Sequence, residues 1–270
     1  MEYVTVQGES VPALGLGTYQ LRGEQCVRAV RTALSLGYRH IDTAEYYRNE
    51  AAIGRAIAES DVDREDLFLV TKVWRTNLAH DDVLRSAQES LRDLRTDYLD
   101  LLLVHWPSRT VPIEETMEAM NHLRRDGSVR HVGVSNFSVE QVREARDASE
   151  APILADQVKY HPQTGQDDLL QFCLDEDVLL TAYSPLAKGS VTSDETLRDV
   201  GQRYGKSPAQ VALRWLVQQP QVAAIPKASS EDHLRENLDV FDFELTEGEM
   251  ETIFELHGGL LDRLRSRIGL

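Results

Sequence analysis

Short apolar runs recur along the whole chain, and the segments between them each have room for one helix. Six of these runs are rich in Val, Ile and Leu, and two earlier ones are weaker. Their continuous apolar character, rather than strict alternation, is typical of parallel strands that are covered on both faces. The strong runs span residues 67–73, 99–104, 129–134, 153–158, 178–183 and 222–225, and the weak ones 13–17 and 38–42.

Helix-patterned segments fill the gaps between these runs. In residues 82–94, apolar side chains recur at helical spacing and charges occupy the other face. Ser207 and Pro208 predict a second helix start, a cap followed by a first-turn proline.

The predicted strand ends, near residues 17, 42, 72, 104, 134, 158, 183 and 225, lie 24 to 42 residues apart. Eight strands with helical connections predict an α/β fold, a (β/α)₈ TIM barrel with extra helices near the C-terminus. A doubly wound sheet would need Gly-x-Gly-x-x-Gly after its first strand. Gly15 and Gly17 begin that motif, but Gln20 takes the third position. No linker-like stretch divides the chain, so we expect residues 1–270 to form a single domain.

The charge balance excludes some partners. The formal net charge is −16, with five lysines among 29 basic residues, which argues against nucleic acid or an anionic membrane as a partner. Abundant Asp and Glu with scarce Lys indicates a salt-adapted, halophilic surface, and the alternative is an ordinary acidic cytosolic protein.

The sequence also predicts a cytoplasmic location. No run approaches the roughly 18 apolar residues of a membrane span, and the N-terminus lacks the regions of a signal peptide. The two cysteines, Cys26 and Cys173, lie far apart in helix-like segments. We interpret them as reduced structural thiols, and no metal site is predicted.

Polar side chains follow the apolar runs at seven predicted strand ends. They are Asp42, Lys72, His105, Ser135 with Asn136, Gln157, Tyr183 and Lys227. A single histidine after a strand is more often structural than catalytic. Seven such positions in a row are hard to explain by packing. The active sites of barrels lie at the C-terminal ends of the strands, so these residues are candidates for an active site.

An Asp, a Lys and a Tyr near one point suggest acid catalysis. A phenol has a reference pKa of about 10, which a neighbouring ammonium lowers. The ammonium in turn needs a carboxylate if it is to stay charged out of water. His105 can hydrogen-bond the same carbonyl oxygen. Such an array protonates an oxygen as a carbonyl becomes an alcohol.

The motifs resemble those of the aldo-keto reductase family. The segment 41–50, Ile-Asp-Thr-Ala-Glu-Tyr-Tyr-Arg-Asn-Glu, is similar to the signature around the family's catalytic Asp and Tyr. The stretches 71–74, 101–107, 133–137, 156–157, 182–186 and 225–227 resemble its lysine, histidine and cofactor motifs in order. The resemblance runs from Ala13 to about Leu256, and the short loops are similar to the prokaryotic branch with 2,5-diketo-gluconate and methylglyoxal reductases.

The resemblance implies a role for each residue. Tyr47 would be the general acid, Lys72 and Asp42 would tune it, and His105 would position the carbonyl. The expected cofactor is NADPH, with NADH possible, bound extended without a Rossmann domain. Ser135, Asn136 and Gln157 would hold the carboxamide, and Tyr183 would stack on the nicotinamide. The remaining cofactor contacts implied are Gly17, Thr18, Asp42, Ser184, Leu186, Lys227, Ser229, His233, Glu236 and Asn237.

The implied substrate is a small aldehyde or ketone, and monomers are the family habit. Its pocket would be lined by Tyr19, Tyr46, Trp74, His105 and Trp106. Aromatic residues at strand ends can equally cap the barrel core, so Trp74 and Trp106 have that alternative.

Two segments depart from the family pattern. His233 stands where members usually carry an Arg that covers the adenine and pairs with the 2′-phosphate, while the adenine-facing pair Glu236 and Asn237 is retained. A neutral imidazole contributes little charge against a phosphate, so strict NADPH specificity is in question. Residues 258–267 are predicted to form a short basic amphipathic helix, and no substrate contacts are assigned to them.

Two other functions fit parts of the pattern. In the first, the chain would be an aldolase-like barrel in which Lys72 forms a Schiff base with the substrate. Alternatively, the chain would be a non-catalytic barrel that binds nucleotide as a redox sensor. The tyrosine and cofactor motifs count against the aldolase, and the complete Asp42, Tyr47, Lys72 and His105 set counts against the sensor.

Overall fold

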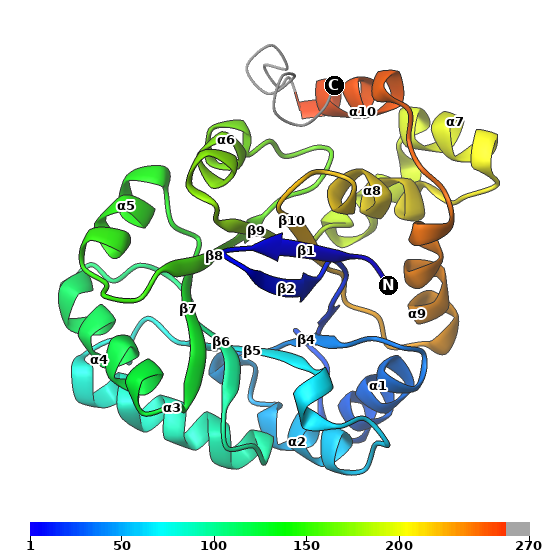
Figure 1. The fold of residues 1–270 in the computed structure, drawn as a ribbon. Coiled ribbons are helices and arrows are strands. Elements are labelled where there is room, and N and C mark those ends of the chain that lie inside the picture. Colours follow the sequence, from blue (N-terminus) through cyan, green and yellow to red (C-terminus); the bar gives the residue numbers. More distant parts are fainter. Residues whose placement is uncertain (258–270) are drawn as a thin grey trace.

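A computed structural model describes residues 1–257 of the chain. Its centre is a parallel eight-stranded sheet in which each strand pairs with the next along the chain, from β3 to β10. The sheet curls round until its ends meet (Figure 1). Leu14 and Ala224 form a parallel bridge there, and the Gly17 amide donates to the Pro226 carbonyl at 3.1 Å. The predicted (β/α)₈ barrel is therefore confirmed.

The eight barrel strands agree closely with the predicted runs. They are β3 (Leu16–Gly17), β4 (His40–Asp42), β5 (Phe68–Val73), β6 (Leu99–Val104), β7 (Val129–Ser135), β8 (Ile153–Lys159), β9 (Leu179–Tyr183) and β10 (Val222–Ile225). Only β3 is much shorter than expected. Its glycine allows a close approach of the neighbouring chain, because a Cβ on Gly17 would lie 2.6 Å from the Ile225 carbonyl oxygen.

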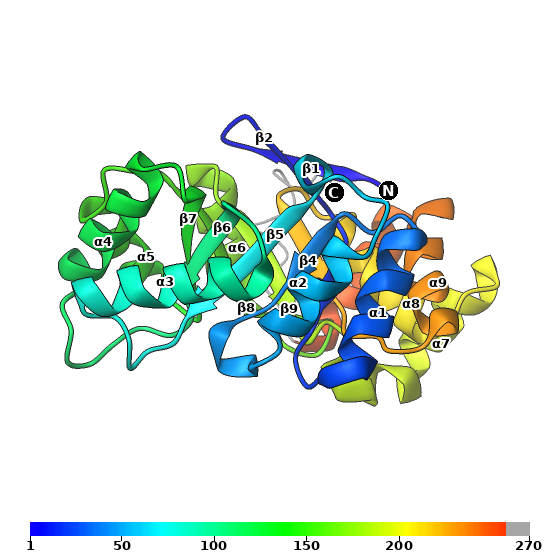
Figure 2. The same cartoon turned by 90° about the horizontal axis from the view of Figure 1, so that it is seen from below.

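Helices surround the barrel (Figures 1 and 2). They are α1 (Gly23–Ser35), α2 (Glu50–Ala58), α3 (His80–Leu94), α4 (Ile113–Arg125), α5 (Val139–Asp147), α6 (Asp167–Glu176), α7 (Glu195–Tyr204), α8 (Pro208–Val217), α9 (Glu231–Leu238) and α10 (Glu247–Phe254). Five 3₁₀ segments within the described residues complete the fold: η1 (Glu45–Tyr47), η2 (Arg64–Asp66), η3 (Ala187–Ser193), η4 (Asp239–Asp242) and η5 (Glu255–His257). The helix start at Ser207 is confirmed, since its side chain and that of Gln210 form a reciprocal cap.

An antiparallel hairpin that the sequence reasoning did not predict lies across one end of the barrel (Figure 2). It consists of β1 (Tyr3–Val6) and β2 (Glu9–Pro12). Gln7 at its turn donates to the Ile153 carbonyl at 3.0 Å, at the start of β8. The hairpin therefore closes the N-terminal end and leaves the C-terminal strand ends for a site.

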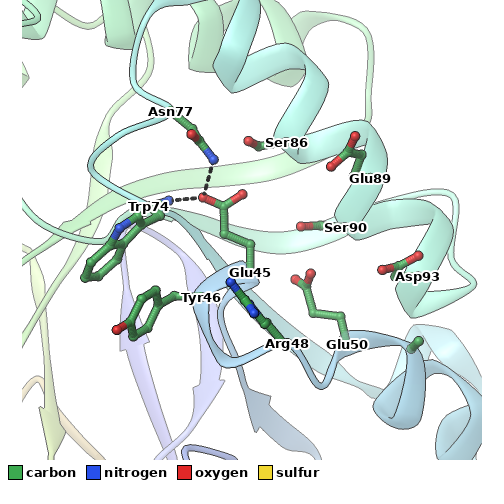
Figure 3. A pocket seen from close by; sticks show the side chains of 11 residues that line it. Glu45, Tyr46, Arg48, Glu50, Trp74, Asn77, Ser86, Glu89, Ser90 and Asp93 are labelled. Atoms are coloured by element: carbon green, nitrogen blue, oxygen red, sulfur yellow. Dashed lines mark hydrogen bonds between the residues drawn. The ribbon is translucent and has the colours of Figure 1, made fainter.

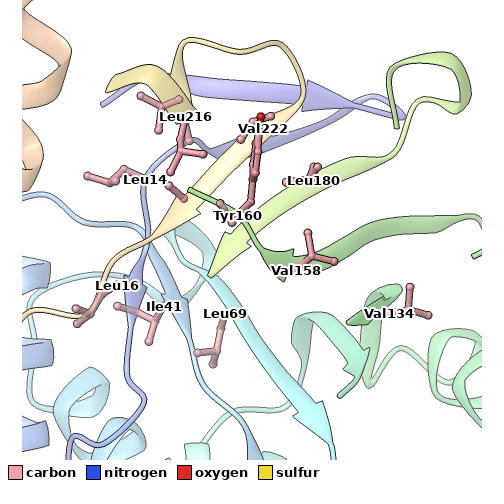
Figure 4. Close-up of a cluster of buried hydrophobic side chains, with 14 of the residues drawn as sticks. Leu14, Leu16, Ile41, Leu69, Val134, Val158, Tyr160, Leu180, Leu216 and Val222 are labelled. Carbon is pink, nitrogen blue, oxygen red and sulfur yellow. The ribbon is translucent and has the colours of Figure 1, made fainter. Parts of the chain in front are cut away.

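Two apolar layers hold the barrel together. The inner cluster joins hairpin residues Val6 and Val11 to side chains of the strands, such as Leu101 and Leu179. The outer cluster lies between strands and helices, and Figure 4 shows part of it, including Leu16, Ile41 and Val222. Burial of both strand faces explains why the strand sequences are continuously apolar.

Three further predictions can be compared with the described residues. Cys26 and Cys173 lie in α1 and α6, and both are buried and unbonded to one another. Among residues 1–257, the helices lack the length and apolar character needed to span a bilayer. The predicted helix at 258–267 lies outside the described residues.

Candidate active site

A buried ion pair occupies the C-terminal end of the barrel. Lys72 Nζ, near the end of β5, donates to Asp42 Oδ1 at 2.6 Å and to the Thr43 carbonyl at 2.7 Å. The other carboxylate oxygen, Asp42 Oδ2, accepts from Gln157 Nε2 at 2.7 Å. Lys72 and Asp42 are each 1% exposed. Both charges are thus paired and hydrogen-bonded, as burial requires.

Tyr47 lies directly beside this pair. It ends the 3₁₀ turn η1, which follows β4, and Lys72 Nζ lies 5.3 Å from the centroid of its ring. Asn49 fixes the turn by donating to the Thr18 and Leu21 carbonyls and accepting from Thr43 Oγ1 at 2.8 Å. Asn49 and Thr43 were not predicted to have roles. Both lie within the 41–50 signature, but the Thr43 carbonyl that accepts from Lys72 has no side-chain signal in the sequence.

The expectation that the pKa of Tyr47 lies below its ordinary value is wrong for the structure. Burial raises the pKa of the Tyr47 phenol above its ordinary value, and the negative charge of Asp42 raises it further. Burial thus outweighs the stabilisation of the phenolate by the Lys72 ammonium, whose charge Asp42 partly compensates at 2.6 Å. Tyr47 therefore keeps its proton through the neutral range, which suits a proton donor.

His105 also lies beside Tyr47. The ring centroids are 5.7 Å apart with planes at 79°. Burial, helped by the charge of Lys72, lowers the pKa of His105 to about 3. Its Nδ1 is buried without a hydrogen-bond partner among the described residues. A neutral imidazole carries one N–H, so His105 can donate to a carbonyl oxygen without adding charge.

The same geometry argues against a Schiff-base lysine. Such a lysine must lose its proton and reach a substrate carbon. Burial lowers the pKa of Lys72, but the Asp42 carboxylate opposes this by pairing with the ammonium. Two hydrogen bonds hold the ammonium beneath the site. This pairing opposes the loss of the Lys72 proton that a Schiff-base lysine requires.

The residues expected to hold a nicotinamide carboxamide form one hydrogen-bonded group. Ser135 Oγ donates to the Gln157 carbonyl at 2.7 Å, and Asn136 Nδ2 donates to the His105 carbonyl at 3.0 Å. The Tyr183 hydroxyl donates to Asn136 Oδ1 at 2.8 Å, which fixes its ring. Asn136 has φ +63°, a backbone conformation in which asparagine is enriched. The structure thus brings these four residues together.

The remaining cofactor candidates lie around this group. Thr18, after Gly17, donates from Oγ1 to the Asp42 carbonyl at 2.9 Å. Ser184, two residues before Leu186, has φ +50°. Lys227, Ser229, His233 and Glu236 are exposed after β10 and on α9. Asn237 is 6% exposed and lies beside Tyr38, so it is the least accessible of the expected adenine contacts.

Aromatic side chains form a rim around Tyr47 and His105. Tyr46 stacks on Trp74 with centroids 4.0 Å apart (Figure 3), and Trp74 meets the His105 ring edge-on at 5.0 Å. Tyr19 and Tyr46 are each 52% exposed, and Trp106 is 39% exposed. Such exposure shows that Trp106 does not simply cap the barrel core.

Asp156 is a buried carboxyl that the sequence reasoning noted only as a motif neighbour of Gln157. It is fully buried, and neither oxygen makes a hydrogen bond within residues 1–257. Burial raises the pKa of Asp156 well above its usual range, and the nearby Phe137 amide opposes this only in part. The sequence does indicate this burial, because the carboxyl group stands inside the strand sequence Ile-Leu-Ala-Asp-Gln-Val.

Asp156→Asn is expected to stabilise the fold, and the gain should grow as pH rises. A carboxyl whose pKa is raised by folding contributes stability below its unfolded value, near pH 4, and loses it as pH rises toward its folded value. The wild type should therefore lose about 1.4 kcal/mol per pH unit relative to the variant. Urea unfolding at pH 5, 6 and 7 measures this, and parallel stability curves for the two proteins would contradict it.

Comparison with known proteins gives the family. Residues 13–257 match the Aldo/keto reductase family. A glyoxal reductase of Bacillus subtilis is 39% identical, over 93% of this chain and 90% of the relative. The methylglyoxal reductase DkgB of Escherichia coli O157:H7 is 38% identical, over 97% and 98%. A crystal structure assigned as a 2,5-diketo-D-gluconic acid reductase B superposes with TM-score 0.93 at 48% identity, over 95% and 91%. The chain therefore belongs to the aldo/keto reductase family, and it reduces carbonyl groups with hydride from NAD(P)H.

Proposed function

We propose that the protein reduces small aldehydes and ketones with NADPH, that 2-oxoaldehydes such as methylglyoxal are among its substrates, and that Tyr47 donates the proton. The observation that carries the proton assignment is the buried Lys72–Asp42 pair beneath the ring of Tyr47, facing the neutral His105. The relatives that act on glyoxal and methylglyoxal support the substrate class.

The side chains divide the work of protonating the carbonyl oxygen. His105 donates a hydrogen bond to that oxygen and sets its direction. Bound reduced nicotinamide supplies the hydride. As the oxygen gains negative charge, Tyr47 passes its proton to it, since an alkoxide is a stronger base than a phenolate. Lys72 stabilises the phenolate that remains, and Asp42 keeps Lys72 charged.

The chemistry of the residues at the strand ends fits a nicotinamide. A carboxamide needs both hydrogen-bond acceptors and donors. Ser135 and Asn136 offer hydroxyl and amide groups, and Gln157 keeps its Oε1 as an acceptor while Nε2 binds Asp42. Tyr183 would lie against the nicotinamide ring. The exposed cation Lys227, with Ser229 beside it, would face the phosphate end.

Preference for NADPH over NADH is expected to be modest. His233 lies exposed in the first turn of α9, where Glu231 and Asp232 add negative charge. Lys227 remains as one cation for a 2′-phosphate, but the planar guanidinium fork of an Arg is absent at 233. A charged hydrogen bond is worth roughly 1.5–3 kcal/mol, or about one to two decades of affinity.

His233→Arg should therefore widen the NADPH preference by about ten- to a hundredfold. The change should appear in the KM for NADPH, with kcat close to the wild-type value. Steady-state kinetics with both cofactors measure it. If the wild type already discriminates more than a thousandfold and the variant leaves that ratio unchanged, another residue reads the phosphate.

We also propose that the surface is adapted to salt, from the −16 charge and the five lysines. Like charges destabilise the compact fold, and salt screens them over about 3 Å at 1 M. The thermal midpoint should therefore climb steeply between low salt and molar KCl. A flat profile across that range would mean that the surface is merely acidic.

The test of the proposed function is oxidation of NADPH and NADH in the presence of glyoxal, methylglyoxal and an aromatic aldehyde. We expect turnover with the small dicarbonyls and faster reaction with NADPH. Failure of every aldehyde in the panel would contradict the proposal. Borohydride trapping of a carbonyl compound on Lys72 would instead support the aldolase chemistry.

A further inference from the structure

The buried carboxyl of Glu50 has no part in the proposed reaction, although it lies directly behind it. Glu50 is the first residue of α2 and is 7% exposed. Its Oε1 accepts a hydrogen bond of 2.5 Å from Thr71 Oγ1. Thr71 precedes Lys72 on β5, and successive side chains of a strand point to opposite faces. Glu50 therefore holds the outer face of the strand whose next residue enters the site.

Glu50 also reaches a cavity of about 400 Å³ (Figure 3). The walls come from η1, α2, α3 and the start of the loop after β5. The charged groups facing the cavity are Glu45, Arg48, Glu89 and Asp93, with Ser86 and Ser90 as neutral polar groups. Lys72 lies on the far side of β5. Protons can thus exchange between Glu50 and solvent through this cavity, on the helix side of the strand.

The charge of Glu50 changes in the neutral range. Burial, with a smaller contribution from the neighbouring carboxylates Glu45 and Asp93, raises the pKa of Glu50 to about 7. Hydrogen bonds from Thr71 and Ser90 favour the charged form and oppose this rise. At pH 8 and above, Glu50 is therefore a buried carboxylate.

Lys72 is the cation that this carboxylate affects. Burial lowers the pKa of Lys72, while Asp42 and, to a smaller extent, Glu50 raise it. Asp42 acts from inside the barrel end, and Glu50 acts from the helix side of β5. An ionised Glu50 thus helps Lys72 to keep its proton at alkaline pH.

We propose that Glu50 is a positioning residue for carbonyl reduction, which fixes β5 through Thr71 and keeps Lys72 charged from behind the strand. This rests on the proposed roles of Tyr47 and Lys72. Loss of the Lys72 proton removes the charge that stabilises the Tyr47 phenolate, so it should set the alkaline limb of the pH–rate profile. Without the Glu50 charge, that limb should begin at lower pH.

The test compares kcat/KM for glyoxal, at saturating NADPH, in wild type and Glu50→Gln from pH 6 to 9.5. The ratio of variant to wild type should be at least about threefold lower at pH 9 than at pH 6.5, which corresponds to half a pKa unit. A constant ratio would overturn the proposal. A purely structural role would change the rate at every pH alike.

Two further variants sharpen the result. Glu89→Gln removes an exposed charge from the same cavity wall and should leave the ratio constant, since solvent screens it. An equal shift in Glu89→Gln would overturn the proposal. Thr71→Val removes the donor that favours the Glu50 carboxylate. It should shift the alkaline limb of the pH–rate profile in the same direction as Glu50→Gln, and it therefore tests the proposal if Glu50→Gln folds poorly.

Tyr47→Phe in the same series of measurements distinguishes failure of the proposed function from failure of the proposed role of Glu50. Normal turnover in Tyr47→Phe would overturn the proposed function itself. An inactive Tyr47→Phe together with a constant Glu50→Gln ratio would overturn the role of Glu50 alone.

Discussion

Lys72→Met is expected to cost about 3–5 kcal/mol of folding stability and at least about a hundredfold in turnover. Methionine keeps the unbranched shape but removes the charge. The Asp42 carboxylate, 1% exposed, would then be buried with only the Gln157 amide as a side-chain donor. An unpaired buried charge is far more costly than the absence of both partners. Turnover falls because nothing then stabilises the Tyr47 phenolate.

The double variant Asp42→Asn/Lys72→Met distinguishes these two effects. It removes both charges, so urea unfolding should show most of the lost stability recovered. Its turnover should stay as low as that of Lys72→Met. Two results would contradict burial of the Lys72–Asp42 ion pair. One is a urea midpoint of Lys72→Met equal to that of the wild type, and the other is a double variant no more stable than Lys72→Met.

The barrel could be predicted because its strands are buried on both faces. Each such strand is a continuous apolar run, and the runs at 99–104 and 222–225 have the bounds of β6 and β10. The hairpin β1–β2 was missed for a physical reason. Its strands have four residues each, and its turn, Gln7–Gly8, uses φ +52° and +81° without the usual Asn-Gly or Asp-Gly signal.

The catalytic cluster could be predicted because parallel strands end at one edge of the sheet. Asp42, Lys72 and His105 lie at the ends of three neighbouring strands, and the structure brings them together around Tyr47. The pKa of Tyr47 could not be predicted, because it depends on burial and on compensation of Lys72 by Asp42. Those are properties of the packed site rather than of sequence spacing.

The roles of two buried carboxyl groups could not be predicted from the sequence either. Glu50 lies within the signature, and Asp156 within a cofactor motif, but the sequence predicts a role for neither. Their importance comes from the side chains around them: Glu50 contacts Thr71 behind Lys72, and Asp156 lacks a hydrogen bond among the described residues. Sequence patterns show which positions are polar, whereas burial and partners decide their charge.

Tyr47→Phe is the other change with a large expected effect. Phenylalanine keeps the ring that packs against Tyr19 at 5.1 Å and His105 at 5.7 Å, and it removes only the acidic proton. General acid catalysis is typically worth about 10²–10⁴-fold, so kcat should fall by that factor. The affinity for NADPH should change little. Tyr3→Phe, the same change on the exposed hairpin strand at the opposite barrel end, should react at the wild-type rate.

The most direct measurement is a single turnover of the Tyr47→Phe holoenzyme. The variant, loaded with NADPH, is mixed rapidly with glyoxal at pH 7, and loss of NADPH absorbance is followed. Because product release does not contribute, the rate reports the chemical step. Proton donation by Tyr47 predicts a rate about a hundredfold or more below wild type, with NADPH bound equally well. A rate above about a tenth of the wild-type value would contradict it.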